Sequence, residues 1–135
     1  MSTATEPVET FYTAVLSGDA GAILAVLHPD FEIHTAPGLP SGAGGTFHGP
    51  HEALAKVWGA VNRDFDTAPH PESWSETADG TIVVTGHYRG TARATGRAYE
   101  AEFAHFWRVD SGRIRWLHQY TDTARWHEAL IPNGR

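Results

Sequence analysis

Cysteine is absent from the 135 residues of this sequence. Without it the chain has no disulfide, no thiolate nucleophile and no thiolate metal site, a composition that fits the cytoplasm. A run of about 18 apolar residues is also absent, which argues against a membrane-spanning helix. The first six residues have neither the basic start nor the apolar core of a signal peptide. We therefore expect a cytoplasmic protein with no membrane partner.

Basic residues are few, because ten lysines and arginines stand against sixteen acidic residues and give a formal charge of −6. No basic cluster occurs, so we expect no nucleic-acid partner. Nine histidines are many for this length, but they form neither a His-Glu-x-x-His nor a His-x-His pattern. His48 and His51 are two ligands without a third, and we therefore expect no metal.

Hydrophobic residues make up 41% of the chain, enough for the core of a single domain over residues 1–135. Helical spacing predicts helices over 5–17, about 20–27 and about 50–66, and Asp122 is expected to cap a short final helix. Strands are predicted over 31–35, 69–79 and 81–88, with a Gly- and Pro-rich loop over 36–49. The order predicts an α+β fold in which three N-terminal helices pack on a strongly curved, mostly antiparallel sheet, forming a cone around one apolar cavity.

Residues 97–122 form the strongest hairpin signal in the chain, with aromatic and β-branched runs on both sides of Asp110-Ser111-Gly112. We expect a three-residue loop with Gly112 in the left-handed region, which pairs His105 with Leu117 and Phe103 with Gln119. A two-residue loop would instead place His105 beside His118. The preferred loop gives an inner face typical of a ligand pocket, built from Phe103, His105, Trp107, Leu117 and Gln119.

His105 is the best candidate for catalysis, since a neutral imidazole takes or gives a proton near pH 7 and burial keeps it a base. Gln119 could orient a ligand carbonyl or hold His105 in one tautomer. Tyr12 and Tyr88 could donate hydroxyl groups to an enolate-like oxygen. The structural alternatives are a core His105 whose nitrogens are satisfied by Gln119 or the loop, a structural polar pair that includes Gln119, and amphipathic core tyrosines at positions 12 and 88. The apolar part of the predicted ligand-binding wall comprises Trp58, Phe103, Trp107 and Leu117.

The order of elements and several motifs resemble the nuclear transport factor 2-like superfamily, in particular its SnoaL-like polyketide cyclases and ketosteroid-isomerase-related members. The motifs are Gly18-Asp19, His28-Pro29-Asp30-Phe31-Glu32, Leu39-Pro40, Gly44-Gly45-Thr46, His48-Gly49-Pro50, Ala104-His105-Phe106-Trp107 and Gln119-Tyr120-Thr121-Asp122-Thr123. This resemblance covers nearly the whole chain. It is specific for the fold and much less so for the reaction.

The resemblance implies which catalytic residues are kept. The positions used by ketosteroid isomerases hold Phe11, Thr35 and Ala104, and those used by limonene-epoxide hydrolases hold Gly86, Tyr88 and Gln119, so neither activity is expected. His105 matches the histidine of SnoaL-like cyclases, whereas Gln119 replaces their aspartate. Thr35, at the position of a catalytic base, is expected to contact the ligand.

Two functions follow from the resemblance. The first is a cofactor-free enzyme that cyclises or isomerises an apolar carbonyl or polyketide-like compound by proton transfer. The alternative is a non-catalytic binding or accessory protein that uses the same cavity. A third interpretation is a plain dimeric scaffold whose cavity is filled by side chains. The outer face of the hairpin carries Phe106, Trp116 and Tyr120, which Trp74 could extend. Because related proteins pair through this convex face, we expect a homodimer.

Overall fold

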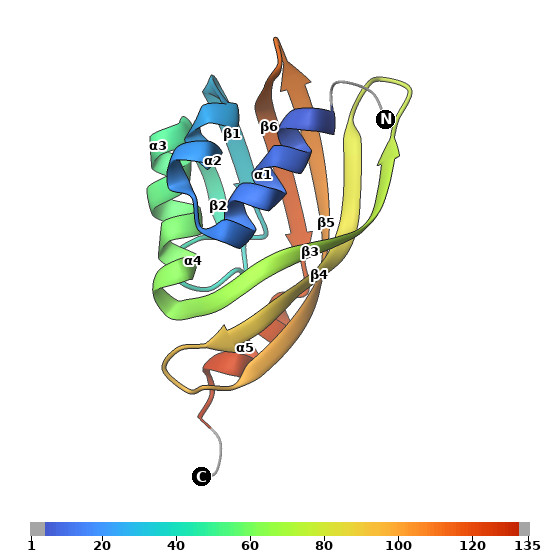
Figure 1. The fold of residues 1–135 in the computed structure, drawn as a ribbon. Helices are drawn as coiled ribbons and strands as arrows, with labels where there is room; N and C mark the ends of the chain where they lie inside the picture. Colours follow the sequence, from blue (N-terminus) through green and yellow to red (C-terminus); the bar gives the residue numbers. More distant parts are fainter. Residues whose placement is uncertain (1–4, 133–135) are drawn as a thin grey trace.

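The predicted hairpin lies at the centre of the computed structural model, which describes residues 5–132. Its strands are β5 (Ala98–Asp110) and β6 (Arg113–Thr121). They belong to a curved sheet of six strands in the order β2-β1-β6-β5-β4-β3 (Figure 1). The remaining strands are β1 (Leu27–Thr35), β2 (Gly45–His48), β3 (Phe65–Glu76) and β4 (Ile82–Ala92). The sheet is mixed, since β1 runs parallel to β6 while the other pairs are antiparallel.

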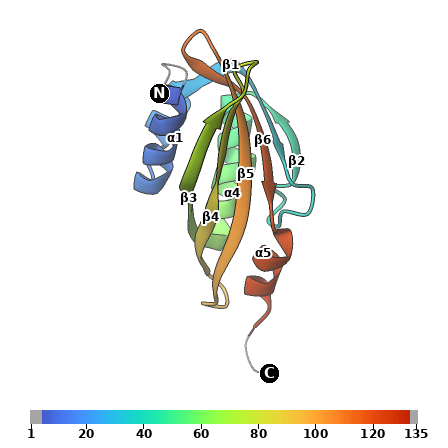
Figure 2. The same cartoon turned by 90° about the vertical axis from the view of Figure 1, so that its right-hand side faces the viewer.

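Helices α1 (Thr5–Ser17) and α2 (Ala20–Val26) precede the sheet, and the Asp19 carboxylate caps α2 by accepting the backbone N–H of Ala22. The third helical segment comprises α3 (Pro50–Ala53), the π-helical turn η1 (Leu54–Trp58) and α4 (Gly59–Asp64). This segment follows β1 and β2, so the expectation of three N-terminal helices is corrected to two. These helices lie on one side of the sheet, and α4 is seen behind the strands in Figure 2.

The last helix, α5 (Thr123–Leu130), begins after Asp122 as predicted. The Asp122 carboxylate makes no capping hydrogen bond, however, and lies 3.8 Å from the Arg125 guanidinium instead. In the part of the chain that the structure describes, no helix is long and apolar enough to cross a membrane.

Several strands depart from their predicted bounds because their partners are distant in sequence. The predicted loop 36–49 contains β2, whose Gly45 pairs with Thr35 at the edge of the sheet. β1 begins at Leu27, where a helix was predicted, because Leu27 pairs with Ile114 of β6. β3 takes in Phe65, which was predicted to end a helix and pairs with Ala92 of β4.

The hairpin turn is tighter than predicted. Ser111 and Gly112 both have positive φ, 55° and 78°, and form a two-residue loop in which Asp110 pairs with Arg113. A bulge then shifts β6 by one more residue, so that His105 pairs with Gln119 and Trp107 with Leu117. The predicted register is therefore wrong by two residues. A shift of two keeps every side chain on its face, and the predicted inner face is retained.

The outer face of the hairpin carries Phe106, Trp116 and Tyr120, as the sequence indicates. The rings of Phe106 and Tyr120 meet edge to face at 5.7 Å, and the Arg108 guanidinium lies 4.7 Å from the centre of the Trp116 ring. Trp74 does not extend this face, because its ring packs 5.7 Å from that of the buried Tyr12.

Gly86 allows β3 to pass close to β4, and this contact generates a prediction. A Cβ atom at Gly86 would lie 2.1 Å from the carbonyl oxygen of His70. Gly86→Ala should lower the free energy of unfolding by about 1–3 kcal/mol, because the main chain must move. Urea denaturation measures the change. Thr85→Ser, on the exposed side of the same strand, is the control and should cost under about 0.5 kcal/mol. Equal midpoints for the two variants would contradict the contact.

Candidate ligand-binding site

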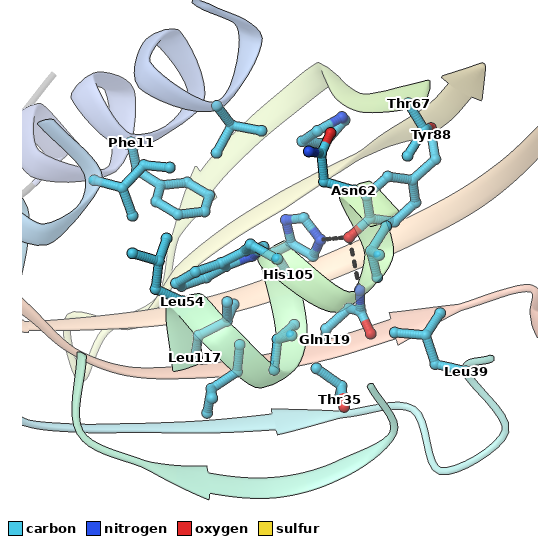
Figure 3. A pocket seen from close by; sticks show the side chains of 18 of the residues that line it. Phe11, Thr35, Leu39, Leu54, Asn62, Thr67, Tyr88, His105, Leu117 and Gln119 are labelled. Carbon is cyan, nitrogen blue, oxygen red and sulfur yellow. Dashed lines mark hydrogen bonds between the residues drawn. The ribbon is translucent and has the colours of Figure 1, made fainter. Parts of the chain in front are cut away.

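A cavity of about 340 Å³ lies between the inner face of the sheet and the helices (Figure 3). Most of its wall is apolar, and no Asp, Glu, Lys or Arg occurs among the described residues that line it. The polar side chains of the wall are Thr35, Asn62, Thr67, Tyr88, His105 and Gln119. Its exposed members, Gly18, Ala20, Gly59 and Asn62, lie at the α1–α2 turn and along α4. The cavity therefore reaches the surface between these helices.

His105 is buried on the central strand β5, with only 3% of its surface exposed. Its Nδ1 lies 2.6 Å from the Tyr12 hydroxyl on α1, and its Nε2 lies 2.8 Å from the Tyr88 hydroxyl on β4. The ring of Phe103 stacks on the imidazole with a centroid distance of 4.0 Å. Burial without a nearby charge lowers the pKa of His105 to about 3, so the ring is neutral near pH 7.

Gln119 and Trp107 each donate a hydrogen bond to one of the two tyrosines that contact His105. The Gln119 amide nitrogen donates to the Tyr88 hydroxyl oxygen at 2.7 Å, while its carbonyl oxygen accepts the Ala36 backbone N–H at 3.3 Å. The Trp107 indole N–H donates to the Tyr12 oxygen at 3.2 Å. Burial raises the pKa of both Tyr12 and Tyr88. The result is a continuous, uncharged hydrogen-bonded chain, named here the tyrosine–histidine network: Trp107, Tyr12, His105, Tyr88 and Gln119. Figure 3 shows its last two bonds as dashed lines.

The structure brings most of the predicted site residues together. His105, Gln119, Tyr88, Thr35, Trp58 and Leu117 all line the cavity. Tyr12, Phe103 and Trp107 are not among the lining residues, and they pack around His105 behind the wall. The Thr35 hydroxyl donates to the backbone carbonyl of Ala43, so the polar part of this side chain is already bonded within the protein.

Sequence reasoning missed Asn62, Thr67 and the π turn. The turn is closed by a bond from the Gly59 N–H to the Leu54 carbonyl, and it places Leu54, Val57 and Trp58 on the wall. The available signal was Gly59 itself, a glycine inside an amphipathic helix. A Cβ atom there would lie 2.9 Å from the Leu54 oxygen. The wider turn therefore depends on glycine at this position.

Within residues 5–132, no group of three or more His, Asp and Glu side chains is arranged to hold a metal ion.

A curved mixed sheet whose inner face is closed by helices over one apolar cavity defines the nuclear transport factor 2-like class of α+β proteins. Residues 8–117 match the SnoaL-like domain, and this chain belongs to that family. No curated protein sequence matches the chain.

Solved structures confirm the class. A nuclear transport factor 2-like protein of Burkholderia thailandensis is 31% identical, with a TM-score of 0.86 over 98% of this chain and 100% of the other. A protein of unknown function from Burkholderia pseudomallei is 32% identical, with a TM-score of 0.87 over 97% and 99%. TerC, co-crystallised with polyporic acid, is 25% identical, with a TM-score of 0.85 over 96% and 98%.

The buried histidine makes stability depend on pH. Folded His105 stays neutral down to about pH 3, whereas the unfolded chain takes up a proton below the ordinary pKa of 6.5. Because the unfolded state then binds more protons, the free energy of unfolding should fall as pH decreases through this window, by up to about 1.4 kcal/mol per pH unit.

Urea titrations between about pH 5 and pH 7, where ordinary carboxylates remain ionised, measure this slope. His105→Gln should flatten it, because glutamine takes up no proton. His51→Gln alters an exposed side chain and should retain the slope. If His105→Gln and the unchanged protein have the same slope, His105 does not carry the effect.

Proposed function

We propose that this protein is a cofactor-free enzyme that cyclises or isomerises a flat, largely apolar carbonyl compound by proton transfer. The observation that carries the proposal is the tyrosine–histidine network, which is buried yet reaches the cavity wall at His105, Tyr88 and Gln119. Aromatic and aliphatic side chains line much of the remaining cavity wall, among them Phe11, Trp58, Leu117 and Trp126. Such a wall suits flat rings, with a few polar groups that can orient them.

Tyr88 is the group that would hold the ligand oxygen. Its hydroxyl is buried and fixed by His105 and Gln119, so it can stabilise charge that develops on a carbonyl oxygen without rearrangement. For His105 to take a proton itself, one of its hydrogen bonds to a tyrosine must open, because both ring nitrogens are bonded. Cyclisation of a compound that already contains an enol fits this site best. As the enol carbon bonds to the carbonyl carbon, Tyr88 hydrogen-bonds to the carbonyl oxygen, and the proton released by the enol neutralises the new alkoxide, so no strong base is needed.

Removal of the Tyr88 hydroxyl tests this role. Tyr88→Phe should lower turnover of an enolisable aromatic 1,3-diketone, followed by absorbance and mass spectrometry, by about a hundredfold to a thousandfold, the usual effect of losing such a donor. Tyr99→Phe is the matched control, because Tyr99 bonds to Thr67 and lies outside the lining residues. It should retain turnover. Unchanged turnover in Tyr88→Phe would refute the role given to its hydroxyl.

A binding or accessory protein is the second candidate. It is favoured by the absence of any carboxylate among the described lining residues and by the low pKa of His105, which makes it a weak base. Thermal-shift and turnover measurements on the same panel of aromatic ketones, with polyporic acid included, separate the two candidates. Ligands that stabilise the protein but are never converted would support binding alone, whereas turnover would exclude it.

The partner we propose is a second copy of this chain, held through the outer face formed by Phe106, Trp116 and Tyr120. Tyr120 is 52% exposed, a large value for an aromatic side chain in the middle of a sheet. Its ring stacks on that of His118, so the aromatic surface is continuous over β5 and β6. Aromatic side chains of this kind are enriched at protein interfaces.

Light scattering after size-exclusion chromatography tests the dimer. The unchanged protein should elute as a dimer, and Tyr120→Glu combined with Trp116→Glu should give monomers, because two buried charges would face their symmetry-related copies. Leu16→Glu changes an equally exposed apolar residue on α1 and should leave the dimer intact. A monomer at every concentration of the unchanged protein would show that this face does not pair.

A further inference from the structure

The two tyrosine hydroxyls beside His105 carry one more proton than their two hydrogen bonds to the imidazole require. A neutral imidazole has one N–H and one lone pair. His105 contacts the Tyr12 hydroxyl through Nδ1 and the Tyr88 hydroxyl through Nε2. One tyrosine must therefore donate to the ring while the other accepts from it. The accepting tyrosine keeps a hydroxyl proton that has to point somewhere else.

The neighbouring side chains cannot take that proton. Trp107 is a donor only, and its indole N–H already points at the Tyr12 oxygen. The Gln119 amide is oriented by Ala36, whose N–H bonds to its carbonyl oxygen, and its NH₂ group therefore faces Tyr88. Both tyrosine oxygens thus receive an N–H from outside the imidazole. Neither receives a new acceptor.

The two tyrosines differ in what surrounds them. Tyr12 is 4% exposed and lies against the rings of Phe11, Trp74 and Trp107, away from the cavity wall. Among the described residues its hydroxyl contacts only His105 and Trp107, so a spare proton there would be a buried donor without an acceptor. Tyr88 lies on the cavity wall, where a spare proton meets the ligand.

We infer that His105 is held as the Nε2–H tautomer, so that Tyr12 donates to Nδ1 and the hydroxyl proton of Tyr88 points into the cavity, where it selects neutral ligands with a carbonyl oxygen. This inference rests on the proposed function for the presence of a ligand, and it names the chemical class of that ligand. Tyr12 and Trp107 are positioning residues that act through His105. Tyr88 accepts N–H bonds from His105 and Gln119, which polarises its own O–H bond and strengthens it as a donor.

The arrangement discriminates between a ketone and the corresponding alcohol. A carbonyl oxygen accepts the Tyr88 proton and brings no proton of its own. An alcohol oxygen accepts the same bond but also brings a hydroxyl proton, beside a tyrosine oxygen that already accepts two N–H bonds. Beside Tyr88 the Gln119 amide presents its NH₂ group, while its carbonyl oxygen is turned to the Ala36 N–H, so that proton is left without a good acceptor there. A ketone should therefore bind about tenfold or more tightly than its alcohol.

The tautomer is observable without any ligand, by long-range ¹H–¹⁵N correlation of protein labelled at histidine. The signals of His105 are those that disappear in His105→Gln. In the unchanged protein their chemical shifts should stay constant as the pH is lowered. We expect a protonated Nε2 and a bare Nδ1. In Tyr12→Phe, Nδ1 should shift as its hydrogen bond is lost, while Nε2 stays protonated. A protonated Nδ1 in the unchanged protein, alone or together with Nε2, would overturn the inference.

Calorimetry with fluorenone and fluorenol, a flat ketone and its alcohol, tests the ligand class. The ketone should bind at least about tenfold more tightly, and Tyr88→Phe should remove the preference whereas Tyr99→Phe should retain it. Equal affinities, a preference for the alcohol, or binding of neither compound would overturn the ligand class. None of these measurements needs turnover, so their failure is distinguishable from failure of the proposed enzymatic activity.

Discussion

The site depends on one constraint, which is that a neutral histidine buried in the middle of the central strand needs a hydrogen-bond partner for each of its ring nitrogens. Those partners are Tyr12 on α1 and Tyr88 on β4. Trp107 of β5 donates to Tyr12 and Gln119 of β6 donates to Tyr88, while Gln119 in turn accepts the N–H of Ala36, just after β1. Because a buried donor or acceptor without a partner is costly, the network fixes α1 against the sheet at the inner end of the cavity. The polar network is thus a structural requirement of the fold as well as the chemical feature of its wall.

The sequence predicted the composition of this wall well, since side-chain alternation along a strand is a local property. His105, Leu117 and Gln119 were placed on the inner face of the hairpin from alternation together with the choice of a three-residue loop, and they lie there. The same argument placed Phe106 and Tyr120 on the outer face. The register was wrong, because a tighter turn and a bulge each shift β6 by one residue. Two such shifts add to an even number, which is why the faces survived an incorrect pairing.

Features that depend on distant contacts could not be predicted in this way. β2 is a four-residue edge strand in a Gly- and Pro-rich segment, and only its pairing with β1 defines it. The position of Tyr12 behind the wall follows from the packing of α1, since its helical spacing is equally consistent with a side chain in the cavity. The π turn requires a backbone bond from Gly59 to Leu54, for which a glycine in a helix is a weak signal. These features set the shape of the cavity, so that shape could not be predicted from the sequence.

Gln119 shows how an amide in place of a carboxylate would change the chemistry of this wall. A carboxylate at position 119 would accept from Tyr88, and the Tyr88 proton would then be used inside the protein. It would also place a negative charge near His105 and raise the pKa of the imidazole, making it a stronger base. The amide reverses both effects, since it donates to Tyr88 and carries no charge. His105 then stays neutral as a fixed part of the wall, and the hydroxyl of Tyr88 remains as the group that can meet a ligand oxygen.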